Sequence, residues 1–277
     1  MTGDSVVLVT GAGAGIGAAT ARQFADDGWT VYATDIETPL PERIAGRCRT
    51  AELDVTDPEQ CGAVLDRIED ETGRLDCLVN NAGYAVPGPL EDVDGDDVER
   101  CFDVLVHGPH RLVQAALPSL RETGGRLIAV SSVLARSAYP GLGAYGAGKA
   151  ALSSMHDSLR MELADSPVAV SVVEPGWVDT EFADRALSAL DDERSPEYDA
   201  VYEALEEGWV LDGGPLATPP EQVAEAIQRA ATDPDPSAHY PVGAFATFVY
   251  WSHWLPARVS DPIATWFGRV TAELDDW

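Results

Sequence analysis

"VVLVTGAGAGIGAATARQF", residues 6–24, joins an apolar run to a helical pattern through a glycine-rich loop. Glycines stand at positions 11, 13, 15 and 17 of this loop. Glycine permits a tight turn, and the start of the helix presents backbone N–H groups that can bind a pyrophosphate. Because the loop follows a predicted strand and precedes a predicted helix, the stretch indicates a dinucleotide site rather than a flexible turn.

Short apolar runs and helical patterns alternate along most of the remaining chain. The apolar runs include TVYAT, LDCLVN, GRLIAVSS and VAVSVVEP, and helical patterns cover residues 94–120, 145–164 and 220–232. Apolar strands that alternate with amphipathic helices are typical of a parallel sheet covered on both faces. We therefore expect an α/β fold with one Rossmann-type, doubly wound domain over residues 1–277, whose ligands bind at the carboxyl ends of the strands.

Two segments interrupt this alternation. Residues 180–219 are acidic and loop-like, and we expect them to form a substrate loop. Residues 240–277 hold four of the seven tryptophans and form an aromatic C-terminal extension. This extension is interpreted as a packing element and a lid over an apolar substrate, because it lacks the basic face of helices that lie on membranes.

The composition is strongly acidic. There are 47 Asp and Glu residues against 18 Lys and Arg residues, which gives a formal net charge of −29. Nucleic acid is excluded as a partner, because phosphate recognition needs a basic surface. The acidic residues are spread along the chain, and dense counter-ions screen self-repulsion of this size, so the charge predicts adaptation to high salt rather than an acidic partner-binding or chaperone role.

Cysteine and histidine usage indicates a reduced protein without a metal centre. The four cysteines include no C-x-x-C pair, and no ligand spacing accompanies His107 and His110. The chain starts directly with a strand-like run and shows no targeting pattern, so we expect a cytoplasmic protein with thiols mainly in its core.

The second strand-like run ends at Asp35, eighteen residues after Gly17. A carboxylate at this place accepts hydrogen bonds from the ribose hydroxyls of NAD and repels the 2′-phosphate of NADP. Neither Ala14 nor Ile36 offers a base that would bind that phosphate. The pattern predicts that the cofactor is NAD. The alternative is that Asp35 is an acidic surface residue like many others in the chain and binds no cofactor.

"AYGAGKAAL", residues 144–152, contains the single lysine of the chain, four residues after Tyr145. On a helix Tyr145 and Lys149 share one face. A free phenol has a pKa of ~10, and a nearby ammonium, together with an oxidised nicotinamide ring, lowers that pKa. Arginine is a poor substitute, because its planar group and higher pKa differ from those of a compact ammonium. The pair therefore indicates a tyrosine general base rather than an ordinary helical pair.

The motifs of this sequence, and the order in which they follow one another, resemble those of the short-chain dehydrogenase/reductase family. The matching motifs are Thr10-Gly-x-x-x-Gly15-Ile-Gly17, Asp54 in LDVTD, NNAG at 80–83, Ser132, Tyr145-x-x-x-Lys149, and Pro175-Gly176 followed by Thr180. The resemblance covers nearly the whole chain and implies a one-domain Rossmann fold that oxidises alcohols or reduces carbonyls with a nicotinamide cofactor. After about residue 100, the chain is most similar to steroid- and retinol-type members.

The resemblance also assigns roles to residues. The catalytic residues are Ser132, with Ser131 as a competitor, Tyr145 and Lys149. The NAD-binding residues are Gly11, Gly15, Ile16, Gly17, Asp35, Asp54, Val55, Asn81, Ala82, Gly83, Tyr145, Lys149, Pro175, Gly176, Val178 and Thr180. The NNAG run also has a structural interpretation, since it stabilises the central strand. Homo-oligomers are expected through the helices at 98–120 and 145–164.

One position departs from the family pattern. In "FDVLVHGPH", residues 102–110, Leu105 replaces an asparagine that in the family positions a water linking the lysine to solvent. Either another group, such as His107 or a backbone carbonyl, holds this relay, or catalysis is slowed. Three hypotheses follow: a dehydrogenase for an apolar secondary alcohol or ketone, a nicotinamide-binding sensor with weak or no turnover, and a related epimerase or dehalogenase. The retained glycine loop and Asp35 argue against a dehalogenase.

The charge pattern generates the first prediction. Because counter-ions screen the repulsion among the carboxylates, molar KCl should raise the melting temperature of the protein. The measurement is thermal unfolding, followed by circular dichroism, at low and at molar KCl. A melting temperature that does not change with KCl would remove the interpretation of salt adaptation.

Overall fold

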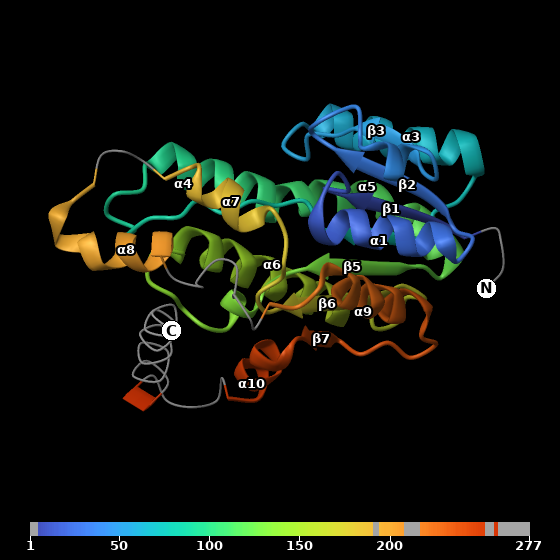
Figure 1. Ribbon diagram of the computed structural model, residues 1–277. Coiled ribbons are helices and arrows are strands. Elements are labelled where there is room, and N and C mark those ends of the chain that lie inside the picture. The colour runs from blue at the N-terminus through green and yellow to red at the C-terminus, as the bar shows by residue number, and fades with distance from the viewer. Residues whose placement is uncertain (1–4, 191–193, 208–216, 253–257, 260–277) are drawn as a thin grey trace.

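A seven-stranded parallel sheet forms the centre of the protein (Figure 1). The computed structural model describes residues 5–190, 194–207, 217–252 and 258–259. The sheet has the order β3-β2-β1-β4-β5-β6-β7, so the order reverses between β1 and β4. The strands are β1 (Val6–Thr10), β2 (Thr30–Asp35), β3 (Arg49–Glu52), β4 (Cys77–Asn80), β5 (Arg126–Val130), β6 (Ala169–Pro175) and β7 (His239–Val242).

Helices cover both faces of the sheet, as the alternating pattern predicts. On β1, Val7 and Val9 face one core cluster, whereas Val6 and Leu8 face the other. The first cluster contains residues of α1 (Gly15–Asp26), α2 (Glu42–Ala45) and α9 (Pro220–Thr232). The second contains residues of α3 (Pro58–Thr72), α5 (Gly108–Thr123) and α6 (Gly143–Glu162). The predicted doubly wound α/β architecture is therefore confirmed.

Local signals set the ends of α3. Asp57 accepts hydrogen bonds from the backbone N–H groups of Glu59 and Gln60, and Pro58 occupies the first helical position. Gly73 ends the helix in the left-handed region, at φ 66°. These features are the ordinary start and stop signals of a helix.

The helix predicted over residues 94–120 is divided into three parts. They are α4 (Gly95–Phe102), a π-helical turn η1 (Asp103–His107) and α5, which continues to Thr123. The stretch is therefore helical, as predicted, but apolar periodicity does not reveal its π-helical turn, because it does not separate an i+4 from an i+5 hydrogen-bond pattern. The turn matters for the site, since Leu105 lies within it and is fully buried.

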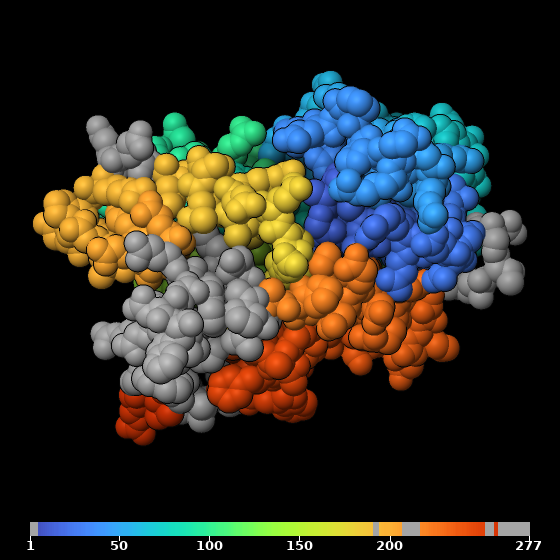
Figure 2. Space-filling view, in the orientation of Figure 1, coloured from blue at the N-terminus to red at the C-terminus, as the bar shows by residue number. Residues whose placement is uncertain are grey.

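The substrate-loop segment forms short helices at one end of the molecule. They are α7 (Phe182–Leu187), a 3₁₀ turn η3 (Pro196–Tyr198) and α8 (Asp199–Glu207). Figure 2 shows α7 and α8, yellow to orange, on the surface at the end far from the N-terminus. The described part of the aromatic extension is residues 240–252 and 258–259, and it contains most of β7 and the helix α10 (Ala244–Ser252). The assignment of the whole tail to one domain stays a prediction, because its other residues lie outside the described ones.

The four cysteines are free thiols, three of them buried, in agreement with their predicted place in the core. Among the described helices, none has the length and apolar character required to cross a bilayer.

Candidate active site

A cavity of about 600 Å³ opens at the carboxyl ends of the strands. Parallel doubly wound sheets bind ligands at the point where their strand order reverses, and here that point lies between β1 and β4. All the residues predicted for the site line this cavity: Gly11, Gly15, Ile16, Gly17, Asp35, Asp54, Val55, Asn81, Ala82, Gly83, Ser132, Tyr145, Lys149, Pro175, Gly176, Val178 and Thr180. The fold therefore brings the predicted residues together, and their individual roles stay predictions.

The glycine-rich loop is packed against the end of β4. A Cβ atom on Gly17 would lie 2.0 Å from the carbonyl oxygen of Gly11 and 2.6 Å from Nδ2 of Asn81. Asn81 Nδ2 in turn donates to the carbonyl oxygens of Thr10 (2.8 Å) and Gly11 (3.0 Å). The structural interpretation of the NNAG run therefore holds for Asn81, whose side chain joins β4 to β1.

The loop end of the cavity fits a dinucleotide. The N-cap of α1, Ala14, has no capping side chain, and the first turn contains no acidic residue. The backbone N–H groups of this first turn therefore have no capping side chain as a partner, and such groups suit a phosphate. At the end of β2, Asp35 accepts hydrogen bonds from the N–H groups of Gly13 (2.8 Å) and Glu37 (3.2 Å). Its carboxylate is thus held at the edge of the cavity, beside the exposed Ile36.

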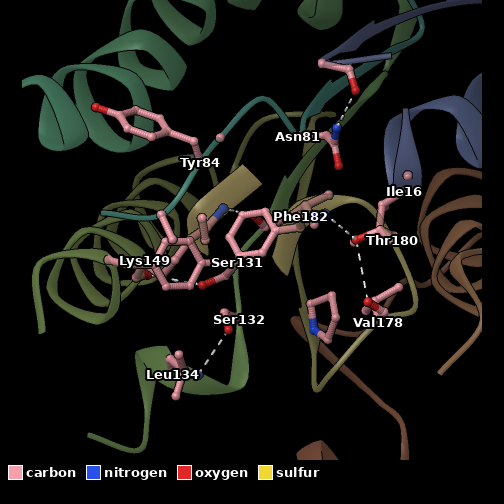
Figure 3. A pocket seen from close by; sticks show the side chains of 18 of the residues that line it. Ile16, Asn81, Tyr84, Ser131, Ser132, Leu134, Lys149, Val178, Thr180 and Phe182 are labelled. Carbon is pink, nitrogen blue, oxygen red and sulfur yellow. Dashed lines mark hydrogen bonds between the residues drawn. The ribbon is translucent and has the colours of Figure 1, made fainter. Parts of the chain in front are cut away.

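The predicted catalytic pair lies on α6, at the opposite end of the cavity. Tyr145 and Lys149 are both buried, and the Lys149 side chain donates a 2.7 Å hydrogen bond to the carbonyl oxygen of Val130. The Lys149 Nζ atom lies 5.7 Å from the centre of the Tyr145 ring. In Figure 3, Lys149 and both serines lie on one side of Phe182, with Thr180, Val178 and Ile16 on the other. The residues predicted for the two ends of a nicotinamide dinucleotide site therefore face one cavity.

The two candidate serines, Ser131 and Ser132, have different hydrogen-bond partners. The Ser131 hydroxyl donates to the carbonyl oxygen of Lys149 (3.1 Å) and lies 2.7 Å from the hydroxyl of Ser153, so it is engaged with α6. Ser132 precedes a 3₁₀ turn η2 (Val133–Ala135) and accepts a hydrogen bond from the N–H of Leu134 (3.1 Å). Its hydroxyl also interacts with Tyr145 and lowers the pKa of that phenol. These contacts favour Ser132 as the partner of Tyr145.

Burial dominates the titration of the pair. It raises the pKa of Tyr145, and the hydrogen bond with Ser132 lowers it only in part. Burial lowers the pKa of Lys149 to about 8. Burial thus disfavours both the phenolate and the ammonium. The lowering of the Tyr145 pKa by Lys149 together with an oxidised nicotinamide ring stays a prediction.

Leu105 fills the space beside Lys149. A Cβ atom on Gly83 would lie 2.8 Å from Leu105 Cδ2 and 3.5 Å from Lys149 Nζ, and one on Gly148 would lie 2.9 Å from Leu105 Cδ1. His107, by contrast, is exposed and is not among the cavity residues. Two groups were predicted to take the place of the missing asparagine. The prediction of His107 is wrong, whereas a backbone carbonyl, that of Val130, does contact Lys149.

Aromatic residues form the wall that faces the predicted catalytic residues. The ring of Phe182, at the start of α7, lies 5.5 Å from that of Tyr145. Trp177 stacks on Phe245 of α10 at 4.3 Å. α10 thus packs against the core and lines the cavity, as predicted for the aromatic extension. Several cavity residues outside the predicted segments give no local sequence signal and were not predicted: Tyr84, Arg136, Tyr139 and Leu142.

A carboxylate holds the middle of the substrate-loop segment. Asp92 accepts hydrogen bonds from the N–H (3.1 Å) and hydroxyl (2.6 Å) of Ser195 and from the hydroxyl of Tyr202 (2.7 Å). These bonds, with Ser195 first, hold the pKa of Asp92 below its usual range. Leu205 of α8 packs on Gly141, shortly before α6. The segment is therefore anchored beyond α7, the helix that lines the cavity.

Comparison with known proteins agrees with this geometry. The family model of short chain dehydrogenases matches residues 5–191. Sulfoacetaldehyde reductase 2 of Chromohalobacter salexigens is 37% identical over 246 residues, which cover 83% of this chain and 90% of that protein. Retinol dehydrogenase 5 of Mus musculus is 33% identical, covering 95% of this chain and 88% of that protein.

Solved structures show the same fold. A short-chain dehydrogenase from Streptomyces avermitilis has a TM-score of 0.80 and 30% identity, covering 100% of this chain and 97% of that chain. A short-chain dehydrogenase from Burkholderia cenocepacia J2315, in complex with NADP, has a TM-score of 0.76 and 25% identity, covering 95% and 99% of the two chains. A related structure from Burkholderia phymatum, in complex with NAD, has a TM-score of 0.76, covers 91% and 95%, and at 24% identity indicates the fold alone.

The contacts of Asp92 generate a prediction. Asp92→Ala removes three acceptor contacts and should make residues 180–207 more susceptible to limited proteolysis by severalfold. Glu91→Gln is the matched control, since Glu91 accepts a single bond, from the hydroxyl of Tyr198. Cleavage is followed by mass spectrometry. Equal cleavage in the wild type and Asp92→Ala would show that Asp92 does not hold this segment.

Proposed function

The chain belongs to the short chain dehydrogenase family, and we propose that it is an NAD(H)-dependent oxidoreductase that interconverts an apolar secondary alcohol and its ketone. One observation carries the proposal. Ser132, Tyr145 and Lys149 meet at one end of a cavity whose other end carries the glycine loop and Asp35.

The proposed chemistry divides between the cofactor and the side chains. When bound, the nicotinamide accepts or supplies the hydride and, in its oxidised form, adds a positive charge. Tyr145 takes the hydroxyl proton of the alcohol during oxidation and returns it to the carbonyl oxygen during reduction. Ser132 donates a hydrogen bond to the same substrate oxygen and stabilises the charge that develops there. Lys149, held by the carbonyl of Val130, binds the ribose hydroxyls and supports the phenolate.

The proposed preference for NAD rests on Asp35. Its carboxylate lies at the edge of the cavity, where it accepts hydrogen bonds from ribose hydroxyls and repels a phosphate at the same place. The neighbouring Ile36 is apolar and 52% exposed, so it supplies no counter-charge. Similar solved structures contain NAD in one case and NADP in another, so the preference is argued from this chain's own residues.

The proposed substrate is apolar, with steroid-, retinoid- or aliphatic-like character. Phe182, Phe245 and Val249 line the cavity near the predicted catalytic residues, and such a wall favours an apolar ligand. Among the relatives, this chemistry is closer to the substrate that the name retinol dehydrogenase implies than to sulfoacetaldehyde.

We further infer a cytoplasmic homo-oligomer, a dimer or a tetramer. Met155 and Met161 on α6 are 38% and 64% exposed. Apolar side chains on that helix suit packing against a second copy of the chain. The four cysteines, all free, suit a reducing compartment.

Leu105 supports a second candidate function, that of a nicotinamide-binding sensor. Its side chain is fully buried and fills the space next to Lys149, where a leucine holds no water. If no other path connects Lys149 with solvent, the protein binds the cofactor but turns over slowly or not at all. The intact set of Ser132, Tyr145 and Lys149 favours the enzyme.

A rate assay in molar KCl tests the proposed function. Steroid, retinoid and aliphatic alcohols are offered with NAD and then with NADP, and NADH or NADPH formation is followed by absorbance. We expect turnover with NAD on apolar alcohols and a loss of at least about a hundredfold in Tyr145→Phe, which lacks the hydroxyl that transfers the proton. Tight NADH binding without turnover on any substrate would favour the sensor, and faster turnover of small polar sugars would refute an apolar substrate.

A substitution at Leu105 tests the relay. Leu105→Asn introduces an amide that can hold a water beside Lys149, and we expect it to raise turnover by about tenfold, at a stability cost of about 1–3 kcal/mol for the buried polar group. Leu105→Met keeps the volume and apolar character and serves as the control. Equal rates in all three proteins would show that proton transfer does not depend on this position.

A further inference from the structure

Four charged or titratable side chains, each buried or half-buried, meet beside α10, a helix that lines the cavity. We call Arg136, Asp157, Glu174 and His239 the buried ionic cluster. Arg136 follows η2, Asp157 lies on α6, Glu174 lies on β6 and His239 begins β7. The Glu174 side chain is 2% exposed and that of His239 is 12% exposed. Arg136 also lines the cavity, so the cluster reaches the site itself.

The hydrogen bonds of the cluster assign a proton to His239. Arg136 donates from Nε to Glu174 Oε1 (2.7 Å) and from Nη2 to His239 Nδ1 (3.0 Å). The other ring nitrogen, Nε2, lies 3.0 Å from Asp157 Oδ1. A guanidinium only donates and a carboxylate only accepts. This arrangement therefore contains a neutral His239 with its proton on Nε2.

A second arrangement is available to the same side chains. Glu174 Oε2 is buried without a hydrogen-bond partner in the described part of the chain, and it lies 3.3 Å from His239 Nδ1. A protonated His239 carries a second N–H, on Nδ1, which can donate to Glu174 Oε2. The same nitrogen can then no longer accept from Arg136. The two arrangements exclude each other, and one proton selects between them.

The charges around His239 set the pH at which this exchange takes place. Glu174 from β6, Asp157 from α6 and Arg136 from the loop after η2 contact the ring. The ring of Tyr250 on α10 lies 6.0 Å away, and Arg160 pairs with Asp157 at 3.2 Å. Glu174 is the main cause of a raised pKa of His239, against the opposing effect of burial. The exchange therefore occurs above the ordinary histidine value of about 6.5.

Arg136 connects the cluster with the wall of the cavity. Its guanidinium lies over the ring of Tyr250, 4.8 Å from the ring centre. Tyr250 belongs to α10, and Val249 of the same helix packs against Val133, the residue after Ser132. A change in the hydrogen bonds of Arg136 is thus transmitted to α10 and to the turn that carries Ser132.

We propose that His239 is a positioning residue whose protonation state sets the position of Arg136 and, through Arg136, of the α10 wall of the substrate cavity. The effect of this positioning on substrate binding rests on the proposed function. Neutral His239 holds Arg136 against the wall, whereas protonated His239 turns to Glu174 and releases one of the hydrogen bonds of Arg136. Since the pKa of His239 is raised in the fold, its contribution to stability is complete below about 6.5 and is lost as pH rises through the raised value.

Two measurements on the full chain test this proposal without any substrate. Imidazole signals are followed by NMR from pH 5 to pH 9, and the missing signal in His239→Asn identifies His239. Hydrogen exchange of residues 244–252, corrected for the intrinsic effect of pH, is measured over the same range. We expect the imidazole signal of His239 to titrate above pH 6.5 and the hydrogen-exchange rate of α10 to change at the same pH. Glu174→Gln should lower the pH at which both changes occur. The exposed His110→Asn is the control and should leave both curves unchanged.

The same variants are then compared in the rate assay. We expect the KM of the best substrate to change severalfold across the titration in the wild type and in His110→Asn, and to be independent of this titration in His239→Asn and His239→Gln, with kcat less affected. Titration of His239 at or below 6.5, or α10 exchange that does not follow it, overturns the proposal. If the NMR and exchange results hold but no substrate is turned over, the positioning role stands and the proposed dehydrogenase function fails.

Discussion

The close contact between the start of α1 and the ends of β1 and β4 is the constraint on which the rest of the structure depends. Gly17 leaves no room for a Cβ atom beside the carbonyl of Gly11, and Asn81 joins the two strand ends through its side-chain amide. This contact sets the edge of the crevice where the strand order reverses. It also directs the uncapped N-terminus of α1 toward the cavity. The end of the cavity proposed for the dinucleotide is thus determined by backbone packing.

The opposite end depends on burial. α6 places Tyr145 and Lys149 in the core, and there the low polarity raises the pKa of the phenol and lowers that of the amine to about 8. At neutral pH the phenol is therefore uncharged, whereas the amine titrates within about one pH unit of that pH. A positive charge brought by an oxidised cofactor is the element that would shift Tyr145 toward the phenolate. The same environment makes Leu105 significant, because a fully buried leucine next to Lys149 keeps water away.

Short local signals predicted most of the fold and the residues of the candidate site. The glycine loop, Asp35, the NNAG run and the Tyr145–Lys149 spacing each lie within one strand–turn–helix unit or one helix, and most of these positions line the cavity; Gly13 and Asn80 do not. The sequence did not reveal the π-helical turn η1, because apolar periodicity is insensitive to one extra residue per turn. It also did not reveal the pairing of Arg136 with His239, which joins positions 103 residues apart. The raised pKa of Tyr145 was missed because the sequence shows the neighbouring ammonium but not the depth of burial.

The central claim is that one crevice binds a nicotinamide dinucleotide through the glycine loop and selects it through Asp35. Equilibrium titration of the protein with NADH and NADPH, followed by nicotinamide fluorescence in molar KCl, tests this claim most directly. We expect NADH to bind at least about tenfold more tightly than NADPH, and Gly17→Ala to bind neither, because an added Cβ would collide with the carbonyl of Gly11. Equal affinity for the two cofactors would contradict the role of Asp35, and undiminished binding by a folded Gly17→Ala would contradict the role of the loop.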